Sequence, residues 1–119
     1  EFINLENVTL SEGPYQEMFK TASVMITDYS SVAFDFAYLK KPVIYYQDGE
    51  YHYGEGYYDY ETMGFGKVVD NEEELVDKVI EYMENNCEME DEYKKRVDSF
   101  FKFTDKNNCK RVYEWLLKH

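Results

Sequence analysis

The chain has 119 residues, enough for one small domain, and with 44% hydrophobic and 18% aromatic residues it should build a packed core rather than stay disordered. The 25 acidic residues outnumber the 13 Lys and Arg, and the resulting formal net charge of −12 argues against nucleic acid as a partner. The sequence does not begin with Met, so we expect residues 1–119 to be one domain taken from a longer protein.

The first part of the chain predicts alternating strands and helices. A short strand is expected at 7–10. A turn at 11–14 then leads into a helix, and four of its apolar residues recur at helical spacing: Tyr15, Met18, Phe19 and Ala22. Residues 24–26 are apolar without polar alternation, which is typical of a strand buried on both faces.

An almost wholly apolar helix is expected over 32–40, where Pro42 ends it, and the β-branched and aromatic run 43–46 predicts the next strand. The resulting βαβαβ pattern indicates an α/β fold with a parallel sheet and right-handed crossovers.

The second part of the chain opens with a segment rich in Gly and Tyr, residues 47–66, which predicts a long loop and a contact surface. A short strand ends this loop by residue 69. Three helices are then expected, over 71–86, 90–101 and 105–118. Their expected buried residues are Leu75, Val76, Val79, Ile80 and Met83 in the first, Val97, Phe100 and Phe101 in the second, and Val112, Trp115 and Leu116 in the third.

The two cysteines, Cys87 and Cys109, lie far apart without C-x-x-C spacing. The alternatives are a reduced pair, which is the default, and a disulfide, which only geometry decides; by themselves the two cysteines form no metal site. No run of 18 apolar residues marks a membrane span.

Five polar side chains follow the strand at 24–26, and they are Thr27, Asp28, Tyr29, Ser30 and Ser31. At the carboxyl end of a parallel strand and the start of a helix, such hydroxyls and backbone N–H groups attract an anion such as phosphate. Ordinary capping of the helix by serine explains the same residues. The sequence matches neither a P-loop nor a dinucleotide-binding fingerprint.

Asp35 is the one charge within the apolar helix, four residues after Ser31 and flanked by Phe34 and Phe36. We expect this carboxylate to be buried and therefore to accept hydrogen bonds. Its donors would be groups of the Ser30-Ser31 turn, which it would brace, or hydroxyls of a bound ligand.

The stretch from Ile26 to Tyr46, with its Thr-Asp-Tyr-Ser-Ser-Val-Ala-Phe-Asp run and Lys-Lys-Pro-Val-Ile ending, resembles the signature of the CDP-glycerol glycerophosphotransferase family. This family contains teichoic-acid primases and polymerases of bacterial cell-wall and capsule synthesis. The segments 14–19 and 56–66 and the acidic helix at 71–86 are also similar to the family, so the resemblance covers nearly the whole chain.

The resemblance implies a GT-B fold of two Rossmann-like domains, each a parallel sheet with flanking helices, and this chain would be its nucleotide-donor-binding, C-terminal part. Ser30 and Ser31 would hold the donor phosphates, and Thr27, Asp28 and Asp35 would shape the same pocket. An acceptor hydroxyl would attack the β-phosphate of CDP-glycerol and CMP would leave, without any further cofactor. A polymer or lipid-linked acceptor would bind through the missing part of the protein. The parent protein is expected in the cytoplasm, peripheral on the inner face of the cell membrane.

The sequence departs from the family in two respects. His52 does not match the family's histidines, so no catalytic residue is assigned, and residues 54–64 contain no Arg or Lys. Because a GT-B site needs both domains and this chain is one of them at most, the isolated chain is expected to be inactive. Missing strands would also expose a sheet edge, which favours self-association.

Two other functions remain open at this point. One is a GT-B glycosyltransferase domain that uses a nucleotide sugar, and the other is a non-catalytic α/β interaction module with a Tyr-rich binding loop.

Overall fold

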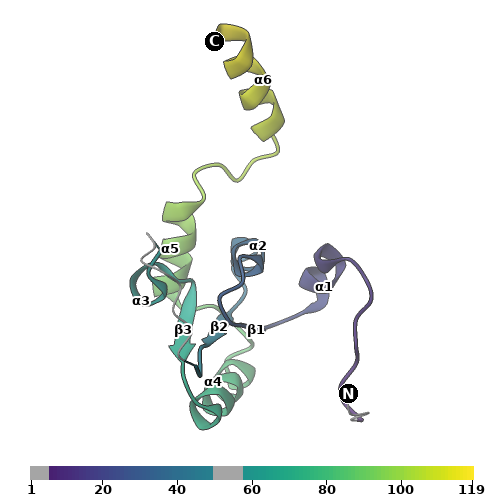
Figure 1. The fold of residues 1–119 in the computed structure, drawn as a ribbon, viewed down its shortest axis with the longest axis vertical. Helices are drawn as coiled ribbons and strands as arrows, with labels where there is room; N and C mark the ends of the chain where they lie inside the picture. The colour runs from purple at the N-terminus through teal and green to yellow at the C-terminus, as the bar shows by residue number, and fades with distance from the viewer. Residues whose placement is uncertain (1–5, 50–57) are drawn as a thin grey trace.

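The structure is a computed structural model that describes residues 6–49 and 58–119, and a parallel sheet forms its centre (Figure 1). The described strands are β1 (Met25–Thr27), β2 (Val43–Tyr46) and β3 (Gly66–Val69), in the order β1-β2-β3. In register, Ile26 lies opposite Ile44, and Ile44 lies opposite Lys67. The predicted mixed α/β fold with a parallel sheet is thus confirmed.

Strand β2 divides the core into two layers because its side chains alternate between the faces of the sheet. Val43 and Tyr45 belong to the larger core cluster, whereas Ile44 belongs to the smaller one. The larger cluster is covered by four helices: α1 (Tyr15–Thr21), α2 (Val32–Tyr38), α3 (Tyr60–Met63) and α5 (Asp91–Phe100). Helix α4 (Glu72–Glu84) covers the opposite face.

Helix α1 is fastened to the start of β2 by one lysine. The ammonium of Lys41 donates hydrogen bonds to the carbonyl oxygens of Phe19, Lys20 and Ala22, over 2.6, 3.0 and 2.8 Å respectively. These carbonyls lie at the C-terminal end of α1, where helix groups lack internal partners and a cation is favoured. Lys41 therefore sets the position of α1 against the sheet.

Helices α4 and α5 are joined through Glu90. This carboxylate accepts hydrogen bonds from the ammonium of Lys78, at 2.6 Å, and from the phenol of Tyr82. Burial alone would raise the pKa of Glu90, but these two hydrogen bonds outweigh burial and lower it. The ionised carboxylate thus braces the joint between the two helices.

Helix α6 (Asn108–Lys118) differs most from its prediction. Its start is three residues later than predicted, and it stands apart from the sheet at the opposite end of the molecule from α4 (Figure 1). The predicted burial of Val112, Trp115 and Leu116 is wrong, since these side chains are 60%, 58% and 61% exposed.

The described N-terminal residues differ as well. Residues 7–10 form no strand and are exposed, so β1 has no strand beside it on its outer side among the described residues. Accordingly Ile26 is 51% exposed, and the prediction that this strand is buried on both faces is wrong. The pattern of residues 24–26 indicates a strand correctly, but no described element buries Ile26.

The remaining helices agree with their predictions in position more than in burial. Val97 is buried on α5 as predicted, and Phe101 packs against the larger core cluster, whereas Phe100 is half exposed. On α4 the inward residues are Leu75, Val79 and Tyr82, whereas Val76, Ile80 and Met83 are exposed, contrary to the prediction. Cys87 and Cys109 are not joined by a disulfide.

Replacing Lys41 by Met should loosen α1. Methionine keeps most of the side-chain length but donates no hydrogen bond, so the three carbonyls of α1 lose their partner. We expect the free energy of unfolding to fall by about 2 kcal/mol, measured by urea denaturation.

Lys20→Met is the matched control, because the Lys20 ammonium makes only an exposed ion pair with Glu17 among the described residues. Such pairs contribute about 0–1 kcal/mol. Equal losses for the two variants would contradict the role assigned to Lys41.

Replacing Gly66 by Ala should separate β2 from β3. A Cβ at Gly66 would lie 1.7 Å from the carbonyl oxygen of Val43, its register partner in β2. Because that obstacle is backbone, the strands must move apart, and we expect a loss of about 3 kcal/mol or more in thermal or urea unfolding.

Gly49→Ala is the control for this change, since a Cβ there meets nothing within 4 Å. It should leave the unfolding free energy within about 0.5 kcal/mol of the unaltered chain. A Gly66→Ala chain as stable as the Gly49→Ala chain would refute the close approach of the two strands.

Candidate functional site

The turn between β1 and α2 builds itself from two of the predicted site residues. The Asp28 carboxylate accepts a hydrogen bond from the Ser30 N–H over 3.2 Å, and the Ser30 hydroxyl oxygen accepts one from the Val32 N–H over 3.4 Å. The carbonyl of Ser30 accepts from the N–H of Ala33. Asp28 and Ser30 therefore shape the turn, and Ser30 bonds the first N–H group of α2, whereas Ser31 at the N-cap position makes no capping hydrogen bond.

The side chains of Thr27 and Ser31 take no part in the hydrogen bonds of the turn. No hydrogen bond joins the hydroxyl of either residue to another described residue, and Ser31 is exposed at the start of α2. The hydroxyl of Ser30 also retains its proton for donation, because its oxygen acts as the acceptor in the turn. The turn thus presents hydroxyl donors that the fold itself does not use.

Asp35 lies on the surface rather than in the core, so the prediction of a buried carboxylate is wrong. It forms no hydrogen bond with the Ser30-Ser31 turn, and the prediction that it braces the turn is wrong too. Asp35 instead lines a pocket of about 400 Å³ between α1 and α2, with Tyr15, Gln16, Phe19, Lys20, Val32 and Leu39. A carboxylate that pairs with no described residue and lies in a largely apolar pocket is an acceptor for ligand hydroxyls.

Tyrosine side chains pack against the β1–α2 turn and support it. The phenol of Tyr60, on α3, donates a hydrogen bond to the carbonyl of Tyr29 over 3.1 Å, and their rings meet edge to face. The Tyr60 ring also contacts Tyr45 on β2 and Tyr58, with centroids 5.1 and 5.0 Å apart. These three tyrosines therefore connect the turn to the centre of the sheet.

This arrangement changes the interpretation of the Tyr-rich segment. Tyr58 and Tyr60 lie within the described part of it and are half-buried, so they belong to the structural support rather than to a contact surface. His52 and the tyrosines at 51, 53 and 57 lie outside the described residues, and the role predicted for that part of the loop stays a prediction.

Tyr45 and Tyr58 act as neutral hydrogen-bonding groups. Burial raises the pKa of the Tyr45 phenol, and burial together with the neighbouring Tyr45 raises that of Tyr58. Both phenols therefore stay protonated near neutral pH. The Tyr45 phenol oxygen accepts a hydrogen bond from the Phe65 N–H over 3.3 Å.

Gln47 is a residue that the sequence analysis missed. It follows β2 directly, and its backbone N–H donates to the carbonyl of Val69 over 2.9 Å. Its side-chain nitrogen Nε2 is buried but has no hydrogen-bond partner among the described residues. A buried amide without a partner costs about 1–3 kcal/mol, so this group at the carboxyl end of the sheet has a hydrogen bond to offer.

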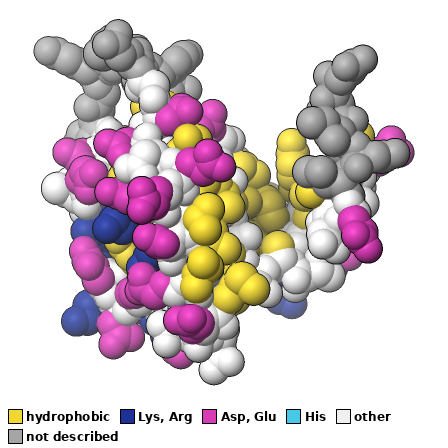
Figure 2. Space-filling view, turned by 90° about the horizontal axis from the view of Figure 1, so that it is seen from below, with side chains coloured by type: hydrophobic (Ala, Val, Ile, Leu, Met, Phe, Trp, Pro, Cys, Tyr) yellow, Lys and Arg dark blue, Asp and Glu magenta, His cyan; other side chains and the backbone are white. Residues whose placement is uncertain are grey.

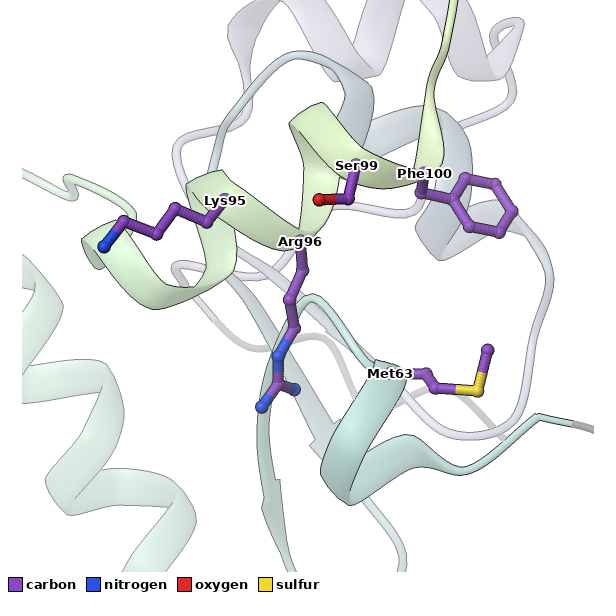
Figure 3. Close-up of a pocket in the computed structure, with 5 residues that line it drawn as sticks. All are labelled: Met63, Lys95, Arg96, Ser99 and Phe100. Carbon is purple, nitrogen blue, oxygen red and sulfur yellow. The ribbon is translucent and has the colours of Figure 1, made fainter.

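A second pocket, of about 350 Å³, lies between α3 and α5 and is shown in Figure 3. Arg96 points out of α5 toward α3, where it donates to the carbonyls of Glu61 and Gly64 and pairs with Glu92. The Lys95 side chain extends away from Met63 and Phe100 (Figure 3). Since its arginine is already used and its lysine turns away, this pocket suits an anion poorly.

Neither a metal site nor a membrane span is found in the described part of the chain. No group of three or more His, Cys, Asp and Glu side chains there could hold a metal ion. Among the described helices, each is too short or too polar to cross a bilayer.

Comparison with known proteins gives several relatives. The chain is 61% identical over 105 residues to the minor teichoic acid biosynthesis protein GgaB of Bacillus subtilis. These residues are 87% of this chain and 12% of that protein. It is 29% identical over 106 residues to the teichoic acid poly(glycerol phosphate) polymerase of Bacillus spizizenii, covering 86% of the chain and 26% of that protein.

A third relative is the teichoic acid glycerol-phosphate transferase of Staphylococcus aureus, 38% identical over 65 residues, which are 51% of this chain and 17% of that protein. The chain thus spans only about an eighth to a quarter of the length of these proteins. No solved structure shows a significant match.

The sequence model of CDP-glycerol:poly(glycerophosphate) glycerophosphotransferases matches residues 5–118, which is almost the entire chain. The resemblance carried by the β1–α2–β2 stretch is therefore confirmed, and the chain belongs to this glycerophosphotransferase family.

Proposed function

We propose that the chain is the donor-binding part of a transferase that moves glycerol phosphate from CDP-glycerol to a cell-wall polymer. The proposal rests on two neighbouring features. The β1–α2 turn has hydroxyls that donate to no described residue, and the pocket beside it contains the Asp35 carboxylate, which pairs with no described residue. Family membership and the printed names of the relatives, which include a glycerol-phosphate transferase, support the choice of substrate.

The phosphates of the donor would bind at the turn. The hydroxyls of Ser30, Ser31 and Thr27 can donate to phosphate oxygens, while Asp28 keeps the Ser30 backbone in place. Because α2 has only seven residues, we assign the hydroxyls, rather than the dipole of the helix, the main part in binding. The buried Nε2 of Gln47, at the same edge of the sheet, is a further donor.

The hydroxyl-bearing part of the donor would bind in the pocket between α1 and α2. There Asp35 accepts hydrogen bonds from hydroxyl groups, and Tyr15 and Phe19 offer apolar surface. Lys20 lines the same pocket and offsets the charge of Asp35. A hydroxyl-rich ligand with a diphosphate thus matches both halves of the site.

In the reaction, an oxygen of the acceptor hydroxyl would form a bond to the β-phosphorus as the bond from that phosphorus to the bridging oxygen breaks. The electron pair of the broken bond goes to CMP, so negative charge grows on its phosphate. Hydroxyl donors fixed at the turn stabilise that charge without rearrangement. The base that takes the acceptor proton is not among the residues assigned to the site.

The remaining features of the parent protein follow as part of this proposal. The chain would form the C-terminal domain of a GT-B enzyme, with the acceptor site in the part that precedes it. The enzyme would act at the inner face of the cell membrane as a peripheral protein, in cell-wall or capsule synthesis, where its polymer or lipid-linked acceptor is made.

Ser31→Ala in the intact parent enzyme should reduce kcat/KM for CDP-glycerol by roughly ten- to a hundred-fold, the effect of one lost charge-assisted hydrogen bond. Thermal stability should not change, because the Ser31 hydroxyl makes no hydrogen bond in the described fold. Ser30→Ala should lower both kcat/KM and the melting temperature, since Ser30 also caps α2.

Ser99→Ala, in the pocket between α3 and α5, is the matched control and should leave the kinetics unchanged. If Ser31→Ala behaves like Ser99→Ala, the turn does not bind the donor phosphates. A panel of CDP-glycerol, CDP-ribitol and UDP-sugars in the same assay separates a glycerophosphotransferase from a nucleotide-sugar glycosyltransferase.

Asp35→Asn should raise KM for CDP-glycerol by about ten-fold while the melting temperature stays the same, because the carboxylate binds ligand hydroxyls and no described part of the fold. Asp98→Asn, an exposed aspartate on α5 that pairs with Lys40, serves as the control. A lower melting temperature with unchanged KM would show that Asp35 is structural.

A further inference from the structure

Helix α3 is held at both of its ends. At its start the Asp59 carboxylate accepts a hydrogen bond from the Thr62 N–H over 3.0 Å. At its end the guanidinium of Arg96, on α5, donates to the carbonyl oxygens of Glu61 and Gly64 over 3.1 and 2.8 Å. Carbonyls at the end of a helix lack partners within it, so these bonds fix the four-residue helix against α5.

Helix α3 presents the side chain of Tyr60 to the β1–α2 turn. The Tyr60 phenol donates a hydrogen bond to the Tyr29 carbonyl over 3.1 Å, and the two rings meet edge to face with centroids 5.6 Å apart. The rings of Tyr45 and Tyr58 pack on the ring of Tyr60 as well. Tyr60 therefore links the fixed helix to the turn.

One peptide group of the turn is held on both of its sides. The Tyr29 carbonyl and the Ser30 N–H belong to the same peptide group, which is planar. The carbonyl accepts from the Tyr60 phenol, and the N–H donates to the Asp28 carboxylate over 3.2 Å. Together the two bonds fix the rotation of this plane. They thereby set the position of Ser30 and, one residue further, that of Ser31.

The position of these hydroxyls matters because the turn has few other means of attracting phosphate. Among the described residues no Lys or Arg side chain bonds to the turn. The chain has a net charge of −12, and Figure 2 shows acidic side chains over much of the face seen from below. A negative field of this kind does not attract an anionic ligand. Binding therefore depends on neutral donors that are already in place.

We propose that Tyr60 is a positioning residue for phosphate transfer, because its phenol fixes the Tyr29–Ser30 peptide and so directs the hydroxyls of Ser30 and Ser31 at the donor phosphates. This inference rests on the function proposed above for the turn. Tyr60 acts through the backbone of the turn and not on the donor itself. Without its hydrogen bond the peptide can rotate and the hydroxyls shift, so the charge that grows on the leaving CMP is stabilised less.

The first test is Tyr60→Phe in the intact parent enzyme, which removes the phenol oxygen but keeps the ring that packs on Tyr45 and Tyr58. We expect kcat for CDP-glycerol to fall by roughly ten-fold, because displaced hydroxyls stabilise the transition state less. KM should rise by less than about three-fold, since the pocket between α1 and α2 keeps its side chains. Steady-state kinetics gives both constants, and thermal unfolding shows that the variant is folded.

A double-mutant cycle with Ser31→Ala distinguishes positioning from structural support. If Tyr60 acts through the hydroxyls of the turn, Tyr60→Phe has less effect once one of them is absent. The loss of kcat/KM in the double variant should therefore be at least about three-fold smaller than the product of the two single losses. A purely structural role would lower the melting temperature and leave the two kinetic losses independent.

Two other phenols serve as controls. Tyr38→Phe also removes a phenol that donates to a backbone carbonyl, that of Thr104 over 3.2 Å, at the other end of α2 from the turn. Tyr82→Phe removes the hydrogen bond to Glu90 that joins α4 and α5, so it should lower the melting temperature. Both variants should leave kcat and KM unchanged.

The outcomes separate this proposal from the function on which it rests. If Ser31→Ala impairs the enzyme but Tyr60→Phe does not, or if the two losses simply multiply, Tyr60 has no positioning role and the proposed function stands. A loss of kcat with Tyr82→Phe as large as that with Tyr60→Phe would also overturn the positioning role, since lower stability would explain both. If Ser31→Ala itself has no effect, the turn does not bind the donor phosphates and both proposals fail.

Discussion

The pairing of β2 on both of its sides is the constraint on which the rest of the structure depends. Beyond its ladders to β1 and β3, the chain after β2 continues the contact through the Gln47 N–H and the Val69 carbonyl. Gly66 allows β3 to approach the Val43 carbonyl closely. Because side chains of a strand alternate, a shift by one residue would exchange Tyr45 and Ile44 between the two core layers. The register thus determines which helices can cover each face.

The candidate site takes its position from this strand through aromatic side chains. Tyr45 is fixed by β2, Tyr60 packs on Tyr45, and the Tyr60 phenol bonds the carbonyl of Tyr29 in the turn. On the other side, Lys41 at the start of β2 holds α1, which forms one wall of the Asp35 pocket. Both walls of the site are therefore placed by residues of β2 or next to it.

Sequence reasoning predicted the elements of this chain better than their surroundings. The β1–α2–β2 unit and helices α4 and α5 lie within two residues of their predicted bounds, because periodicity and capping are local properties. The same periodicity says that α6 has an apolar face, but not that anything covers it. For Ile26, Val76 and Trp115 the missing information is what lies beside each side chain, and no described part of the chain buries them.

The location of the candidate site was likewise predicted better than the roles of its residues. Composition singled out the turn, yet it treated Asp28, Ser30 and Ser31 alike. Their roles differ because Asp28 and Ser30 hydrogen-bond backbone groups of the turn, whereas Ser31 does not, and this depends on side-chain geometry. Gln47 was missed because one amide after a strand is no motif; only its burial without a partner distinguishes it.

Net charge gives a last example of an average that hides structure. The total of −12 is the sum of a net charge of +3 on the C-terminal segment, residues 102–119, and a net charge of −15 on the rest of the chain. Electrostatic interactions are screened within about 10 Å at ordinary salt, so a surface responds to the charges beside it and not to the total. An argument from total charge therefore applies to the sheet and its covering helices, but not to the C-terminal segment that contains α6.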